Sequence, residues 1–255
     1  MTSNALHVLS RQFVLPKEGS TLEECEDAVG VDEEGLRFAV ADGATEAFDA
    51  RRWAVRLAEA WVGAKSAPLA VEGFRTWLAA QGEWLHATWE GRAMPWYAEE
   101  KARAGSYAAF VGLQLRPCER GLSWDAVALG DACLVQRRGE ETCAAVPVKG
   151  RGDFNSCPPL VPSHESLREA ALERLVKGEG SAARGDVFLL MSDALAAWYF
   201  EFAGAGGDAV ARFDSLLAAS ENEALEELVR EERRAKRMRD DDVAVVRVAV
   251  EGGDG

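Results

Sequence analysis

Aspartates stand beside the ends of several apolar, strand-like segments of this sequence. Asp42 closes the segment LRFAVA, and Asp193 follows the segment VFLLMS. A strand end next to a turn lets a carboxylate leave the apolar core, so its charge avoids the full cost of burial. If several such ends meet at one edge of a sheet, their carboxylates form a dense negative cluster. The aspartates in these positions are Asp42, Asp131, Asp193 and Asp241.

An acidic cluster of this kind predicts a bound cation, because closely spaced like charges destabilise one another until cations neutralise them. Glu26 and Asp27 precede a further strand-like segment and extend the acidic set. Neither histidine nor cysteine shares the pattern, and oxygen-only ligands favour the hard cations Mg²⁺ or Mn²⁺. Each aspartate alone would be an ordinary turn or helix-cap residue. The prediction of a cation site therefore depends on the six acidic residues taken together and not on any one of them.

The composition is that of a globular protein, and the charge limits its partners. The 255 residues include 29 Lys+Arg and 43 Asp+Glu, giving a net charge of −14, and 48% are hydrophobic. A nucleic-acid backbone requires clustered basic residues, so the acidity excludes nucleic acid as the main partner. An anionic substrate would need metal ions as intermediaries. The sequence shows neither a signal-peptide pattern nor an apolar run of about 20 residues, so we expect a cytoplasmic protein with no membrane contact.

The elements that must position these carboxylates follow from hydrophobic periodicity. Trp53, Leu57 and Trp61 recur at four-residue spacing and predict a helix over residues 51–62. Further helices are expected over residues 71–89, 165–176, 193–202, 208–218 and 221–236, with a helix-to-helix turn over 203–207. Strands are expected over residues 28–31, 36–41, 106–115, 122–129, 134–138, 142–148, 187–191 and 243–250. This order favours α+β layers over a doubly wound sheet.

Six short motifs follow one another along the chain. They read CEDA (25–28), VADGATEA (40–47), GSYAAFVGL (105–113), ALGDACLVQRRG (128–139), VFLLMSDALAAW (187–198) and DDVAVVRV (241–248). In number, order and spacing they resemble the metal-dependent serine/threonine protein phosphatases of the PPM (type-2C) family, especially its compact bacterial members. The resemblance runs from about residue 20 to residue 250. It implies one catalytic domain over residues 1–255, built as a central antiparallel β-sandwich flanked by pairs of helices.

The resemblance also implies a metal site at one edge of the two sheets. Asp42 matches the aspartate that bridges two metal ions, and the backbone carbonyl of Gly43 matches a second ligand. Asp193 and Asp241 match the aspartates that hold one ion. In this family a metal-activated water attacks the phosphorus of phosphoserine or phosphothreonine, so Asp42 and Asp193 are the implied catalytic residues.

Three further acidic residues take roles from the same resemblance. Glu26 and Asp27 match the acidic pair near the other ion, and Asp131 matches the aspartate associated with a third, weaker ion in bacterial relatives. The implied cofactors are two Mn²⁺ or Mg²⁺ ions, with a third at Asp131. The implied partners are a phosphorylated protein substrate and a partner kinase, and we expect a monomer.

The sequence departs from the family at the phosphate-binding arginine. This residue usually stands five positions before the aspartate of the acidic pair, where this chain has Leu22. Lys17, Arg51 or Arg52 are substitutes for it, although each also fits a solvated surface charge. The departure keeps open an alternative, a non-catalytic PPM-like regulatory or binding module. The common asparagine after the last aspartate is also replaced, by Asp242.

A haloacid-dehalogenase-type phosphohydrolase is a second alternative, because it also uses aspartates and Mg²⁺. That chemistry requires two aspartates in a DxD-type motif, and the residue two positions before Asp42 is Val40. The motif therefore fails. Within the PPM reading, residues 147–185, which include FNSCPP (154–159), are expected to form a variable flap-like segment that influences substrate choice.

Overall fold

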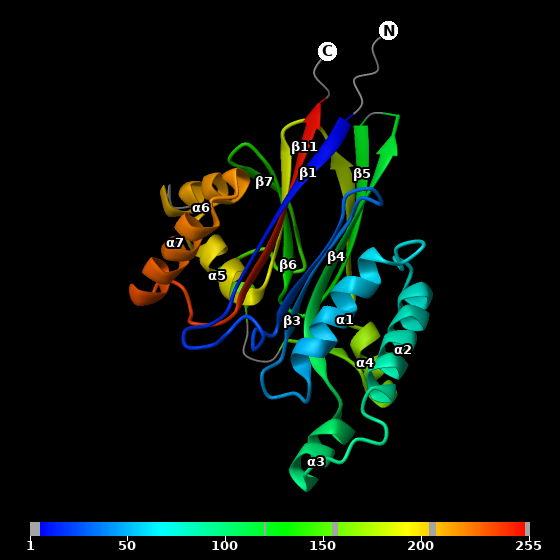
Figure 1. Cartoon of the computed structure of the whole chain (residues 1–255). Coiled ribbons are helices and arrows are strands. Elements are labelled where there is room, and N and C mark those ends of the chain that lie inside the picture. Colours follow the sequence, from blue (N-terminus) through cyan, green and yellow to red (C-terminus); the bar gives the residue numbers. More distant parts are fainter. Residues whose placement is uncertain (1–5, 120, 155–157, 204–207, 253–255) are drawn as a thin grey trace.

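In the computed structural model, which describes residues 6–119, 121–154, 158–203 and 208–252, two antiparallel sheets pack face to face (Figure 1). One sheet has the strand order β1-β11-β10-β6-β7. Its strands are β1 (Leu6–Leu15), β11 (Val243–Gly252), β10 (Asp186–Met191), β6 (Cys133–Arg138) and β7 (Glu141–Val146). The other has the order β2-β3-β4-β5-β9, with β8 paired to β4. Its strands are β2 (Asp27–Asp32), β3 (Arg37–Gly43), β4 (Tyr107–Cys118), β5 (Gly121–Leu129), β8 (Val161–Pro162) and β9 (Val176–Ala182).

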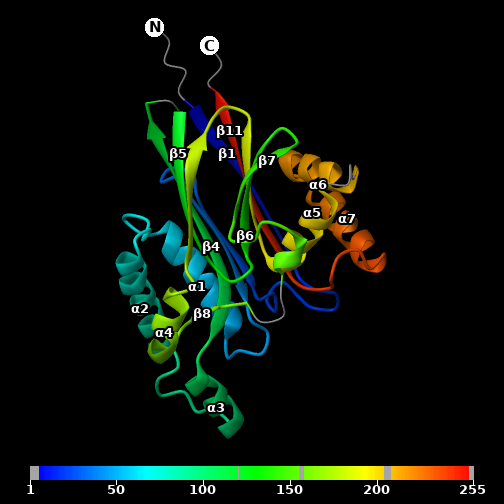
Figure 2. The same cartoon turned by 180° about the vertical axis from the view of Figure 1, so that it is seen from behind.

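Helices cover the outer faces of both sheets, as Figures 1 and 2 show from opposite sides. The β2–β9 sheet carries α1 (Ala50–Val62), α2 (Val71–Ala87) and α4 (Glu165–Leu172), whereas α3 (Trp96–Ala104) extends beyond its end. The β1–β7 sheet carries α5 (Asp193–Phe202), α6 (Asp208–Ala219) and α7 (Asn222–Arg234), and a short 3₁₀ turn covers Arg151–Asp153. The layers confirm the predicted α+β sandwich flanked by helices. None of the described helices is long and apolar enough to cross a membrane.

Three apolar clusters hold these four layers together. One lies between the sheets and includes Phe38, Trp124 and Phe188. The second packs α5, α6 and α7 onto the β1–β7 sheet, and the third packs α1 and α2 onto the β2–β9 sheet. In the third, the predicted stripe of α1 is confirmed, because Trp53, Leu57 and Trp61 are all buried. Gly112 of β4 makes room for it, since a Cβ there would lie 2.5 Å from the Trp61 ring.

The largest difference from the predicted elements lies in residues 147–185. The helix predicted over 165–176 ends at Leu172, and Val176 begins β9, which pairs with β5 along the sheet. Part of the expected flap is therefore sheet. Glycine has a low strand propensity, and Gly178 and Gly180 hid this strand in the sequence. A Cβ at Gly180 would lie 2.7 Å from the indole Nε1 of Trp124, so the glycines make room for that ring.

β1 and α3 also had no predicted counterpart. The segment before residue 20 forms β1, which pairs with β11 from Leu6 to Leu15. Helix α3 also lay in a stretch with no apolar stripe, and it contains residues of both charges. Residues 155–157 of the FNSCPP motif and residues 204–207 of the predicted turn lie outside the described residues.

Candidate functional site

The predicted carboxylates come together at one edge of the two sheets. Asp27 begins β2 and Asp42 lies near the end of β3, where the two residues are direct cross-strand partners. The Gly43 N–H donates to the Glu26 carbonyl at 3.1 Å, which holds the two chain segments together. A Cβ at residue 43 would lie 2.9 Å from both the Ala50 and the Glu26 carbonyl oxygens, so this close turn requires glycine.

The second sheet supplies the other two aspartates of the edge. Asp193 is the first residue of α5, directly after β10, and Asp241 lies two residues before β11. Ser192 joins these segments, because its N–H donates to the Ala244 carbonyl at 3.0 Å and its Oγ accepts from the Ala244 N–H at 2.9 Å. The Asp193 N–H donates to Asp42 Oδ2 at 3.4 Å, which connects the two halves of the edge.

The proximity of these groups is evident in their pKa values. Burial raises the pKa of Asp42 well above its usual range, and the charges of Asp27, Asp193, Asp131 and Asp241 add to that shift. Burial also raises the pKa of Asp27 well above its usual range, against a hydrogen bond from Ser192 that lowers it. Carboxylates arranged in this way are costly to ionise together unless a cation is near.

Asp131 joins the same group from the turn between β5 and β6. Its side chain is buried, and this burial, with the charge of Asp193, raises its pKa to about 6. Burial and Asp193 likewise raise the pKa of Asp241, and Arg239 opposes that shift. The structure thus places Asp131 near Asp193 at this edge.

One oxygen at this edge is buried without a partner. Asp27 is 6% exposed, and its Oδ2 accepts no hydrogen bond from the residues that the structure describes. A buried polar atom of this kind is costly, and a bound ion or water is the usual explanation. With the oxygen-only donor set around it, this atom fits a hard cation. Within the described part of the chain, however, no three acidic, histidine or cysteine side chains stand in a ligating arrangement.

Several solved structures superpose on this fold over nearly its whole length. The Mycobacterium tuberculosis serine/threonine phosphatase PstP/Ppp superposes with a TM-score of 0.64 at 15% identity, over 96% of this chain and 99% of that chain. A PstP catalytic domain in complex with two manganese ions gives 0.59 at 16% identity, over 97% and 100%. PppA, a regulatory component of T6SS in Pseudomonas aeruginosa, gives 0.58 at 18% identity, over 96% and 98%.

The chain has the PPM phosphatase fold. The resemblance seen in the motifs is therefore confirmed at the level of the fold. No family model matches the sequence, and no curated protein matches it either.

Within this PPM fold, Asp242 positions the acidic pair. Its Oδ1 accepts from the Lys17 N–H and its Oδ2 from the Glu26 N–H, both at 2.8 Å. These bonds connect the start of β11 to the segment that leads into β2. The aspartate in place of the usual asparagine thus has a structural role, because both of its oxygens accept backbone hydrogen bonds.

The three candidate phosphate-binding residues lie in different surroundings. Lys17 Nζ is 3.5 Å from Glu26 Oε2 and so contacts a predicted ligand. Arg52 Nη1 is 3.1 Å from Asp49 Oδ2, and Arg51 is exposed at the start of α1. Leu22, which stands in place of the family's arginine, is 57% exposed. The structure thus brings Lys17, but not Arg52, into contact with the acidic edge.

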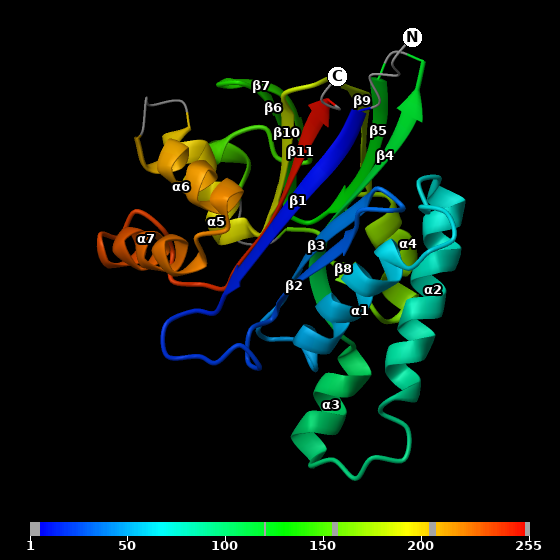
Figure 3. The same cartoon turned by 45° about the horizontal axis from the view of Figure 1, so that its top comes forward.

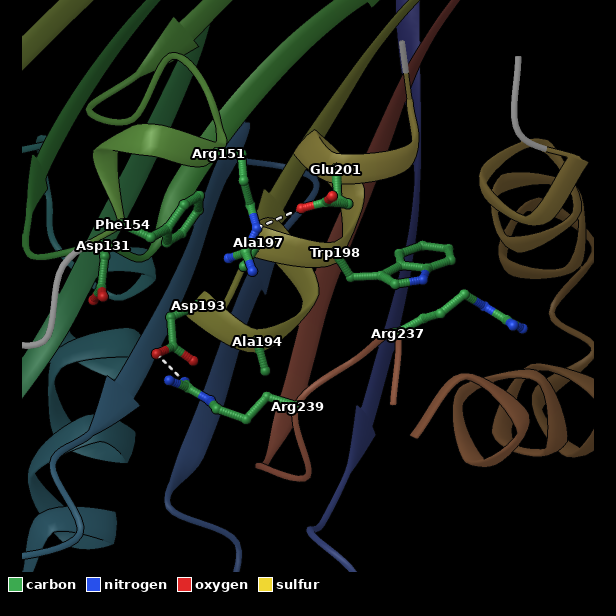
Figure 4. A pocket seen from close by; sticks show the side chains of 10 residues that line it. All are labelled: Asp131, Arg151, Phe154, Asp193, Ala194, Ala197, Trp198, Glu201, Arg237 and Arg239. Atoms are coloured by element: carbon green, nitrogen blue, oxygen red, sulfur yellow. Dashed lines mark hydrogen bonds and ion pairs between the residues drawn. The ribbon is translucent and has the colours of Figure 1, made fainter. Parts of the chain in front are cut away.

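Sequence reasoning missed Arg239. Its guanidinium forms an ion pair with Asp193 and lies 3.1 Å from Asp241 Oδ2, so a cation stands between two predicted ligands. Figure 4 shows this side chain in a cavity of about 340 Å³ beside α5, which Asp131 also lines. Its position two residues before Asp241 was the only sequence signal, and a basic residue in an acidic run is normally a solvated charge.

Proposed function

We propose that this protein hydrolyses phosphoserine and phosphothreonine in proteins, in a reaction that requires Mn²⁺ or Mg²⁺. One observation carries the proposal. Aspartates from both sheets share one edge of a PPM fold, and Asp27 there has a buried oxygen without a partner. Two neighbours support the choice of ion, a PstP domain in complex with two manganese ions and RsbX in complex with magnesium.

The residues that would hold the ions are those at the joined ends of the sheets. Asp42 lies between the two halves, and the Gly43 carbonyl lies beside it. Asp193 and Asp241 would hold one ion, Glu26 and Asp27 the other, and Asp131 a third. Bound ions of this kind neutralise phosphoryl oxygens and lower the pKa of a water molecule.

The chain's own contribution is to orient these oxygens before the ions arrive. The Asp193 N–H holds Asp42 Oδ2, and Ser192 fixes the start of α5 against β11. Asp242 fixes Glu26 through its backbone. Asp42 and Asp193 therefore act as the proposed catalytic residues through ligand positions that the sheets hold in place.

The proposed substrate is a phosphorylated protein in the cytoplasm, and a partner kinase would supply it. The proposed state of the chain is a monomer. Lys17 is the best placed of the three candidates to contact the substrate phosphate, because it already lies at the acidic edge.

A non-catalytic PPM-like module is the second candidate function. The observation that favours it is Leu22, an exposed apolar residue where phosphate binding would need an arginine. The two functions differ in hydrolysis and not in fold. A regulatory module would keep the acidic edge and bind a protein partner without turnover.

The test is Mn²⁺-dependent hydrolysis of p-nitrophenyl phosphate and of a phosphothreonine peptide. We expect hydrolysis by the wild type and its loss in Asp42→Asn. Asp125→Asn is the matched control, because this aspartate pairs with Arg116 on the outer surface of the sheet. A folded wild type that binds Mn²⁺ in calorimetry but hydrolyses neither compound would support the regulatory module, and one that binds no Mn²⁺ would contradict both the metal site and the phosphatase.

A further inference from the structure

Arg239 stands where the proposed metal ions would need ligands. Its guanidinium contacts both Asp193 and Asp241, and both are proposed to hold the same ion. Two neighbouring carboxylates repel each other, and a guanidinium between them offsets part of that repulsion. A divalent cation bound to the same oxygens would meet the charge of Arg239. The two cations would therefore compete for these oxygens.

Other arginines in the same cavity do not compete in this way. Arg151 pairs with Glu201 at 2.6 Å, and Arg237 forms two hydrogen bonds to Glu232, at 2.7 and 2.8 Å. Neither glutamate belongs to the proposed metal site. In Figure 4 the Arg151–Glu201 and Arg239–Asp193 pairs appear on different sides of the cavity.

The ion pairs of Arg239 do not extend to Asp27, on the other half of the edge. They reach Asp193 and Asp241, whereas Asp27 Oδ2 stays buried without a hydrogen-bond partner. Arg239 thus offsets part of the negative charge on one side, and Lys17 contacts Glu26 on the other. The unpartnered Asp27 oxygen fits a further cation at this edge.

The side chain of Arg239 can leave its position at low cost. It is 58% exposed and borders the cavity, so its guanidinium can turn into solvent without opening the core. The backbone around it is fixed, because Arg233 donates to the Pro16 carbonyl at 2.9 Å and also to the Asp241 carbonyl. Displacement of the guanidinium thus needs a change in the side chain alone.

We propose that Arg239 is an internal counter-cation, which holds Asp193 and Asp241 in the metal-free protein and which a divalent ion must displace. This inference rests on the proposed metal-dependent function and deepens it. Arg239 would lower the affinity for the ion held by these two aspartates and keep the empty edge stable. It is a positioning residue for the ligands and not a catalytic residue.

The test is calorimetric titration of Mn²⁺ into the full chain and into three variants. Arg239→Gln removes the competing charge and should tighten Mn²⁺ binding about three- to fivefold, the upper end of the scale of partly exposed ion pairs. Arg239→Lys keeps the charge and should stay within about twofold of the wild type. Arg151→Gln is the matched control, since it removes one charge from the same cavity but from a glutamate outside the site. It should leave Mn²⁺ affinity unchanged.

A second readout is the melting temperature in EDTA. Arg239→Gln should melt below the wild type, and saturating Mn²⁺ should remove the difference. Mn²⁺ binding to Arg239→Gln but not to the wild type would also support the inference. Equal or weaker Mn²⁺ binding by Arg239→Gln, or equal tightening by Arg151→Gln, would overturn it while the proposed function stands. If neither the wild type nor Arg239→Gln binds Mn²⁺, both proposals fail.

Discussion

The two halves of the acidic edge carry similar charges in different surroundings. Asp27 and Asp42 face each other across β2 and β3, and burial raises the pKa of both. Asp193 and Asp241 come from α5 and the segment before β11, and Arg239 lies between them. Desolvation opposes ionisation of the first pair. The second pair shares one cation, Arg239, which opposes but does not cancel the raised pKa of Asp241. The two halves should therefore respond differently to metal, to pH and to mutation.

The largest loss of activity should come from two single variants, each of which removes one proposed metal ligand from one half of the edge. Asp42→Asn and Asp193→Asn should each lower Mn²⁺-dependent hydrolysis of p-nitrophenyl phosphate by at least about 100-fold, because the reaction needs ions on both sides. The measurement is the steady-state rate at saturating Mn²⁺. If one variant keeps most of its activity, the two halves do not form one site.

The next largest difference between the two halves should be in the melting temperature of the protein in EDTA. An ionised Asp27 destabilises the native state above its usual pKa, because folding raises that pKa. Asp27→Asn should therefore melt roughly 2–8 °C above the wild type in EDTA at pH 7.5. The gain should shrink toward pH 4, where the wild-type Asp27 is already protonated.

The matched variant for this measurement is Asp241→Asn, whose charge already meets Arg239. It should change the melting temperature by less than Asp27→Asn does. Equal gains from the two variants would show that Arg239 does not distinguish the halves.

Asp131 should give a smaller effect that depends on pH. Its pKa is raised to about 6, so it is ionised and able to bind a cation only above that pH. Asp131→Asn should lower hydrolysis by less than about tenfold at pH 8 and leave it nearly unchanged at pH 5. A pH–rate profile of both proteins measures this. A loss of the same size at both pH values would contradict the assigned pKa.

The smallest expected effect is a change in KM when a residue that contacts the substrate phosphate is replaced. Lys17 contacts Glu26 at the acidic edge, whereas Arg52 pairs with Asp49 at the start of α1. Lys17→Gln should raise KM for p-nitrophenyl phosphate about two- to fivefold with little change in kcat, the scale of a partly exposed charge. Arg52→Gln serves as the control and should leave KM unchanged. A raised KM in Arg52→Gln with an unchanged KM in Lys17→Gln would instead assign the phosphate contact to Arg52 of α1.

The sequence allowed prediction of those parts of the molecule whose pattern is local. The stripe of Trp53, Leu57 and Trp61 has the helical period, and the aspartates beside apolar strands mark the sheet ends. The sequence did not predict β9, because its glycines lower the strand propensity of the segment. These glycines leave space for the ring of Trp124 on β5. The need for that space arises only when β5 and β9 pair, so it cannot be read from the β9 segment alone.

The same limit applies to the site. The motifs singled out Asp42, Asp131, Asp193 and Asp241, and the structure places these four aspartates near one another at one edge. The contact between Arg239 and two of these aspartates depends on the path of the chain after α7, which Arg233 and Asp242 fix through distant backbone atoms. These contacts join residues that are far apart in the sequence, so no local sequence pattern predicts them.

A crystal structure of the protein grown with Mn²⁺, with anomalous difference maps at the manganese edge, tests the central claim most directly. We predict two peaks about 3.5–4 Å apart, both against Asp42, one also against Asp193 and Asp241 and the other toward Asp27. In that structure the guanidinium of Arg239 should have left Asp193. An edge without anomalous peaks, and with Arg239 still paired to Asp193 and Asp241, would contradict the account.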